Sequence, residues 1–196
     1  MDISWFMRSL NEPIARKANK EDRCTGRFWE GRFKSQALLD EAALLTCMAY
    51  VDLNPIRAQI AKTPEESEYT SIRRRVKSAM VGSQPSELMK FKEGEVSIEV
   101  VHSTLLQYQL EDYLELVDCT GRIIRADKAG SIDSHTIAIL NRLHLPCENW
   151  IYLTREFGRV FKGAVGTPEH LTEFTEHVGL KRRYGISSCQ KWLNSA

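Results

Sequence analysis

Ala49-Tyr50-Val51-Asp52-Leu53-Asn54-Pro55-Ile56-Arg57-Ala58 is the stretch from which the fold of this chain can be worked out. A helical run from Asp40 to Leu53 leads into it. The Asn54-Pro55 step closes that helix, because a residue before proline avoids helical dihedral angles. Residues four apart share one face of a helix, so Tyr50 and Asn54 are expected to point the same way. A phenol can attack phosphorus or an acyl carbon, and an amide oxygen can bind a hard cation. By spacing alone, however, Tyr50 is more often a half-buried aromatic residue.

Aromatic and basic residues are interleaved just upstream, in Phe28-Trp29-Glu30-Gly31-Arg32-Phe33-Lys34-Ser35. Rings beside cations can stack on unpaired bases and hold the nucleic-acid backbone. The same rings can instead fill a core while the cations face solvent, and the residues alone favour this second interpretation for Phe28, Trp29 and Phe33. The pattern predicts an extended segment, as a strand or hairpin, from Phe28 to about Leu38.

Together, these two segments resemble the REP-associated and related single-tyrosine transposases of the HUH nuclease superfamily. In that family a segment GxFWxGRFKS precedes a helix that ends in YxxLNPxRA. The resemblance is dense over roughly residues 3 to 76, and the later residues resemble, more loosely, a C-terminal extension carried by one bacterial branch.

The resemblance implies DNA transposition, in which single-stranded DNA is cleaved and joined through a phosphotyrosine intermediate. It implies that Tyr50 is the nucleophile and that Asn54 is a ligand of a divalent metal, Mg²⁺ in the full-length family. Single-stranded or hairpin DNA is the implied partner. The residues that the resemblance assigns to DNA contact are Arg27, Arg32, Lys34 and Arg57.

The sequence departs from the family pattern at the metal site, because it holds no His-hydrophobic-His triplet. The family places this triplet on strands that would precede residue 1, so we expect this chain to be the C-terminal part of a longer transposase, as a truncation, a decayed copy or a fragment. We therefore expect no metal to be bound, and no metal-dependent nicking, by this chain alone. We also expect exposed apolar surface on Leu10, Ile14, Leu44 or Met48, which a homodimer would cover.

Composition narrows the class of protein further. The 196 residues carry a net charge of +1 and are 42% hydrophobic, which is ordinary for a globular protein. Residues 1–80 hold 14 Lys and Arg against 11 Asp and Glu, which weakly favours this part as a nucleic-acid surface. No apolar run is long enough to span a membrane and no signal peptide is recognisable, so we expect a cytoplasmic protein without a membrane partner. The five cysteines and five histidines show no metal-ligand spacing.

The expected fold class is mainly α with one short extended or hairpin segment, as the remnant of a ferredoxin-like α/β transposase domain followed by a helical C-terminal region. The expected domains are 1–80 for the transposase part, 81–95 for a linker and 96–196 for the helical extension. Ser4 is expected to cap the first helix, and Pro13 to kink or break it. Expected helices cover residues 4–19, 40–53, 55–60, 110–119, 134–143, 148–165, 168–178 and 184–193, with a basic helix at 73–77 and a short strand at 96–101.

Three functions compete at this stage. The first is a transposase-related DNA-processing protein that is inactive alone. The second is a non-catalytic helical DNA-binding or interaction module. The third is a structural, partner-binding helical protein without nucleic-acid affinity, and it ranks last.

Overall fold

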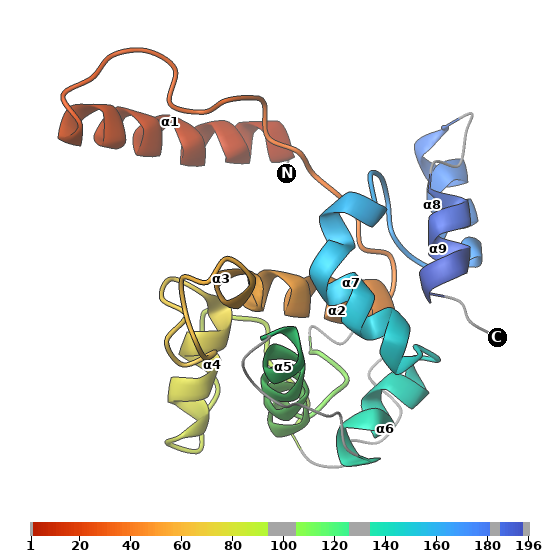
Figure 1. Cartoon of the computed structure of the whole chain (residues 1–196). Helices are drawn as coiled ribbons and strands as arrows, with labels where there is room; N and C mark the ends of the chain where they lie inside the picture. Colours follow the sequence, from red (N-terminus) through yellow and green to blue (C-terminus); the bar gives the residue numbers. More distant parts are fainter. Residues whose placement is uncertain (1, 94–104, 126–133, 181–184, 194–196) are drawn as a thin grey trace. The chain divides into compact units, whose positions relative to one another are not determined.

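The computed structural model describes residues 2–93, 105–125, 134–180 and 185–193, and this part of the chain contains nine helices and no strand (Figure 1). The expectation of a mainly helical protein is therefore confirmed. The chain forms two compact units, the N-terminal unit (Met1–Gln36) and the core unit (Ala37–Ala196).

The N-terminal unit consists of helix α1 (Ile3–Glu21) and a segment that runs back along it (Figure 1). Asp2 caps the helix, because its carboxylate accepts the backbone N–H of Ser4 at 2.7 Å, so the expectation that Ser4 is the cap was wrong. Asp2 is the stronger cap because its oxygen reaches the free N–H groups of the first turn. The returning segment is tied to α1 where the indole N–H of Trp29 donates to the carbonyl of Asn11 at 3.1 Å.

Proline inside α1 does not break the helix. Pro13 lies within the continuous stretch Ile3–Glu21, so the expected break is absent. A proline in a helix interior deprives the carbonyl four residues earlier of its donor and costs about 3 kcal/mol. No side chain of α1 is buried, so packing within this unit offsets little of that cost.

Helix α2 (Glu41–Asp52) of the core unit forms where the sequence predicted a helix over residues 40–53. Asp40 caps it and accepts the N–H of Ala43 at 2.8 Å, as expected. Small residues line its buried sides, which lets other helices approach closely. The Cβ of Ala43 and Ala49 is wholly covered, and Leu45 is 1% exposed. A short helix, α3 (Asn54–Arg57), begins at the Asn-Pro step, as predicted from proline's fit to a first helical turn.

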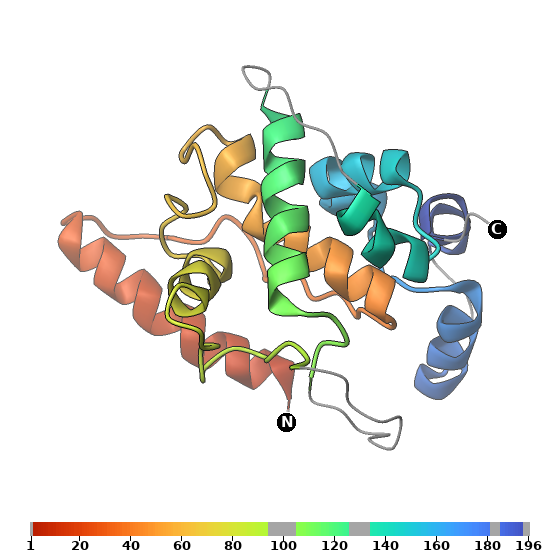
Figure 2. The ribbon, with the colours of Figure 1, turned by 90° about the horizontal axis from the view of Figure 1, so that it is seen from below.

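Helix α5 (Leu110–Ile124) runs through the middle of this unit and crosses α2 (Figure 2). Helices α3, α4 (Ser71–Ala79), α6 (Ser134–Arg142) and α7 (Cys147–Val160) pack on it. Tyr113 and Trp150 are fully buried in this core, and the Trp150 indole N–H donates to the Thr120 hydroxyl at 2.9 Å. Each large buried side chain of this kind stabilises the fold by about 1.5–3 kcal/mol.

The last two described helices, α8 (Pro168–Val178) and α9 (Ile186–Leu193), complete the core unit. Asp40 links the start of α8 to the start of α2, because its second carboxylate oxygen accepts the backbone N–H of Thr167 at 2.6 Å. Gly166 lies beside this contact, because a Cβ at this position would come within 2.8 Å of the Leu39 Cβ and 2.9 Å of an Asp40 carboxylate oxygen. Glycine is therefore the residue that this junction accommodates.

Two expectations fail between the helices. Residues 28–38 form no hairpin, and the isolated bridge between Leu38 and Val165 is their one ladder contact in the described chain. The segment expected as a linker at 81–95 contributes Phe91 to the core, at 1% exposure. The expected strand at 96–101 lies outside the described residues. No helix in the described ranges combines the length and apolar character that crossing a membrane requires.

Candidate functional site

Tyr50 and Asn54 lie at the end of α2 and the start of α3, one helical turn apart, as the spacing predicted. Tyr50 is half-buried against α7. Its ring lies 5.8 Å from that of Phe157, and its hydroxyl is the nearest atom to the place where a Cβ of Gly158 would be. Asn54 is exposed. The phenol therefore faces a neighbouring helix at close range.

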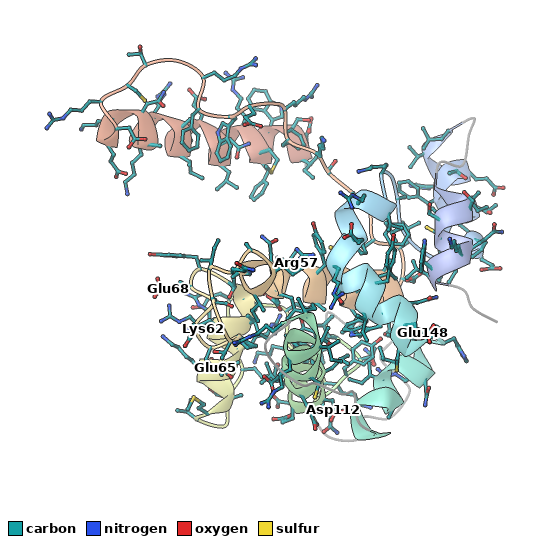
Figure 3. The ribbon with its side chains drawn as sticks, in the orientation of Figure 1. Arg57, Lys62, Glu65, Glu68, Asp112 and Glu148 are labelled. Carbon is teal, nitrogen blue, oxygen red and sulfur yellow. The ribbon has the colours of Figure 1, made fainter. Side chains whose placement is uncertain are left out.

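Arg57 joins this pair to α7, and it lies where α3 meets that helix (Figure 3). One guanidinium nitrogen donates to the carbonyls of Thr154 and Arg155, at 2.9 and 2.8 Å. The other terminal nitrogen donates to the Asn54 side-chain oxygen at 2.8 Å. The guanidinium carbon also stands 3.9 Å from the centre of the Tyr50 ring, in a cation–π contact. Three donors of Arg57 are thus engaged within the protein.

The oxygen of Asn54 is poorly placed to hold the divalent cation that the resemblance implies. Mg²⁺ requires several oxygen ligands in near-octahedral array. The Asn54 oxygen already accepts from a guanidinium, whose positive charge would repel a metal at the same point. Within the described ranges, no three His, Cys, Asp or Glu side chains converge on one point. The residues around Asn54 therefore do not fit a divalent metal in this conformation.

On another side of α2, a buried polar cluster forms that the sequence analysis did not identify. Asp52 is 1% exposed and accepts the Ser71 hydroxyl at 2.5 Å, the Ile72 N–H at 3.2 Å and the Tyr113 hydroxyl at 2.7 Å. Burial raises the pKa of Asp52, against the hydrogen bonds and the nearby Arg75, which lower it. The only sequence signal was an acidic residue that follows the apolar second half of this helix.

Arg75, one of the basic residues expected in the helix at 73–77, belongs to this cluster rather than to the surface. It is 3% exposed, donates to the Met89 carbonyl at 3.0 Å and lies 4.7 Å above the Phe91 ring. Burial lowers its pKa, although the charge of Asp52 raises it. Its neighbour Arg73 pairs with Glu68 at 2.9 Å. Arg75 is therefore the member of the basic run that packs in the core, whereas the Arg74 side chain is 60% exposed.

The remaining residues assigned to DNA contact, Arg27, Arg32 and Lys34, are exposed in the N-terminal unit. Arg32 lines a groove of about 400 Å³ between α1 and the returning segment. Trp29 and Phe33, which the residues alone favoured as core side chains, also line this groove, as does Arg8 of α1. Tyr50, Asn54 and Arg57 gather at one point of the core unit, whereas Arg27, Arg32 and Lys34 belong to the other unit.

Comparison of the chain with protein-family models, with curated proteins and with solved structures finds no match.

Proposed function

We propose that this chain is a transposase-related protein that binds single-stranded or hairpin DNA and does not by itself form the tyrosyl–DNA link. The observation that carries this proposal is that one sequence contains both the motif at residues 28–35 and the motif at residues 49–58. The first segment resembles a transposase motif rich in cations and rings. The second resembles a nucleophile motif, and its Tyr50 and Asn54 lie one turn apart at a helix end.

Two features support the absence of strand cleavage by this chain alone. A nucleophile must reach its target atom in a near-attack geometry. Tyr50 instead has Arg57 on its ring and α7 beside its hydroxyl. In addition, the sequence holds no His-hydrophobic-His triplet that would complete a metal site with Asn54. Non-covalent DNA binding requires neither feature.

The test is to incubate the full chain with a labelled hairpin and a labelled single strand, with and without Mg²⁺. Binding is followed by anisotropy, and covalent adducts are detected on a denaturing gel. We expect binding that weakens as salt rises, because phosphate contacts release counterions. Tyr50→Phe should bind equally well, and no adduct should form. Absence of salt-dependent binding would refute the DNA assignment. A Mg²⁺-dependent adduct that Tyr50→Phe abolishes would refute the claim of inactivity.

A second candidate function is a non-catalytic helical interaction module with a protein partner, which includes a second copy of the chain. The favouring observation is an apolar stripe on α1, where Phe6 is 54% exposed and Leu10 is 46% exposed. Ile3 and Ile14 continue this stripe at helical spacing. Concentration-dependent mass in sedimentation, without any affinity for DNA, would favour this function over the first.

A further inference from the structure

The groove in the N-terminal unit combines features that a nucleic-acid strand requires. It lies between one side of α1 and residues 29–33, and its volume of about 400 Å³ is within the range of ligand clefts. Two aromatic rings and two guanidinium groups line it, from Trp29, Phe33, Arg8 and Arg32.

The Trp29 ring of the groove is held in place before any ligand arrives. The Trp29 indole N–H is bonded to the Asn11 carbonyl at 3.1 Å, and Phe28 contacts the indole edge-on, with ring centres 4.8 Å apart. Trp29 nevertheless remains 41% exposed. A ring that is already oriented loses little conformational entropy when a planar group stacks on it.

The charges of the groove suit a polyanion. Arg32 stands 5.8 Å from the Phe33 ring centre, so a cation and a stacking surface lie side by side. Glu12 also lines the groove, but it pairs with both Arg8 and Arg16, so its charge is offset locally. Residues 1–36 hold eight Lys and Arg against five Asp and Glu. The net positive charge of this unit would attract phosphate.

From these features we infer that the groove binds unpaired nucleotides of single-stranded DNA, with bases stacked on Trp29 and Phe33 and phosphates against Arg8 and Arg32. This inference rests on the proposed function and specifies which strand form is bound and where. A duplex offers its phosphates but keeps its bases stacked inside, so it cannot use the two rings. Single-stranded DNA exposes both groups at once.

The experiment measures the affinity of the full chain for three labelled probes of equal length. These are an oligothymidylate, its duplex with oligoadenylate, and an abasic strand that keeps the phosphates but lacks the bases. Stacking contributes about 1–3 kcal/mol per base, which corresponds to a change in affinity of roughly 5- to 150-fold. We expect the oligothymidylate to bind more tightly than either other probe by at least the lower figure.

Variants locate the contact on the protein. Phe33→Ala should weaken oligothymidylate binding by roughly tenfold, whereas Phe33→Tyr, which keeps the ring, should bind as the native chain does. Arg32→Ala should reduce the slope of log affinity against log salt by about 0.7, the value for one phosphate contact on a single strand. Arg23→Ala is the matched control, because it removes the same charge from the same unit at an exposed position outside the groove. Tyr69→Ala is the control for loss of an exposed ring.

The failures of the two proposals are distinguishable. If the chain binds DNA but the abasic strand binds as tightly, or Arg23→Ala costs as much as Arg32→Ala, the groove is not the site, while the proposed function stands. If oligothymidylate and hairpin DNA both fail to bind, both proposals are overturned. Binding to phosphatidylglycerol vesicles in place of DNA would also overturn both, and would show that the rings and cations serve a lipid surface. The abasic comparison remains decisive if Phe33→Ala does not fold, because it alters only the probe.

Discussion

Arg57 illustrates how one residue of a recognisable motif can hold a fold together. Its guanidinium is the hydrogen-bond donor to two carbonyls of α7 and to Asn54, and it stacks on Tyr50. An arginine fork provides this combination because it offers several donors in one plane together with a flat face. The same contacts keep the Asn54 oxygen occupied. In this conformation Arg57 therefore connects two helices, in addition to any contact with DNA that the resemblance implies.

Replacing Arg57 by alanine should destabilise the chain by about 2 kcal/mol, because hydrogen bonds from a charged donor contribute roughly 1.5–3 kcal/mol and two helix carbonyls lose their partner. Arg57→Lys should recover little of this loss, since an ammonium group lacks the planar fork. Urea unfolding followed by circular dichroism measures the change. Arg159→Ala is the control, because Arg159 is 82% exposed and pairs only with its helix neighbour Glu156 among the contacts described for it. Equal stability of Arg57→Ala and the native chain would contradict this account.

At residue scale, the sequence identified neighbours on one helix but not partners from distant segments. The spacing placed Tyr50 beside Asn54 because helix geometry alone brings them together. The two carbonyls that bind Arg57 are 97 and 98 residues away in the chain, and no local pattern encodes such a pairing. Asp52 was overlooked for the same reason, since its partners Ser71 and Tyr113 belong to other helices.

Asp52 gives a prediction about pH. Burial raises its pKa above the usual value of 3.8, so the folded state holds the proton to higher pH than the unfolded state does. Its contribution to stability is therefore complete below the unfolded pKa and is lost as pH rises through the folded pKa. Asp52→Asn cannot titrate. The difference in unfolding free energy between the native chain and Asp52→Asn should be largest below the unfolded pKa and should shrink as pH rises from the unfolded to the folded pKa, by about 1.4 kcal/mol for each unit by which the pKa is raised.

Chemical denaturation at a series of pH values tests this, with Asp112→Asn as the control. Asp112 is partly exposed on α5, and its substitution makes the same change in net charge. A difference for Asp52→Asn that grows as pH rises would mean that the hydrogen bonds and Arg75 outweigh burial. The direction of the slope thus separates the two physical causes.

At the scale of the elements, the packing of α2 on α7 depends on a close approach between Tyr50 and Gly158. A Cβ at position 158 would lie 3.1 Å from the Tyr50 hydroxyl, which is tighter than ordinary contact, and 3.7 Å from the ring carbon that carries it. Glycine in a helix interior costs about 1 kcal/mol relative to alanine. Helix α7 therefore has a residue of low helix propensity at position 158, where a larger side chain would contact the Tyr50 hydroxyl.

A double substitution measures the energetic coupling between positions 50 and 158. Gly158→Ala in the native background should be neutral or destabilising, because the hydroxyl must move. In the Tyr50→Phe background the hydroxyl is gone, so Gly158→Ala should stabilise by about 0.5–1 kcal/mol through helix propensity. The coupling between the two sites, taken from four thermal unfolding curves, is the readout. Purely additive effects would show that the phenol does not contact α7 at this point.

Sequence patterns predicted elements better than they predicted the connections between them. The expected helices at 40–53, 134–143 and 168–178 match α2, α6 and α8 closely, because caps and prolines mark those ends. The hairpin predicted for residues 28–38 is absent from the structure. Their apolar residues suggested a strand, yet no partner strand exists in the described chain to complete a ladder. A linker was predicted at residues 81–95 because Gly82 and Pro85 lie there. Glycine and proline also mark turns within a domain.

At the scale of the whole molecule, the two units differ in what stabilises them. The core unit buries Trp150, Tyr113 and Phe157, whereas α1 buries no side chain. The boundary at Gln36 and Ala37 carries no glycine or proline, so composition did not reveal it. The expected domains at 1–80 and 96–196 follow the family resemblance, and they remain a prediction about descent. The structure instead packs α2, α3 and α4 with the later helices α5 and α7.

This division predicts that residues 37–196 fold without residues 1–36. The fragment should show the same cooperative unfolding transition and the same midpoint temperature as the full chain, because the large buried side chains all lie in the core unit. Residues 1–36 alone should keep part of the helical signal of α1, since Asp2 caps this continuous helix and the Trp29 indole ties the returning segment to it. Circular dichroism of the fragment, the isolated N-terminal peptide and the full chain provides the comparison. A fragment that melts well below the full chain would contradict this prediction, because residues 1–36 would then contribute to the stability of the core unit.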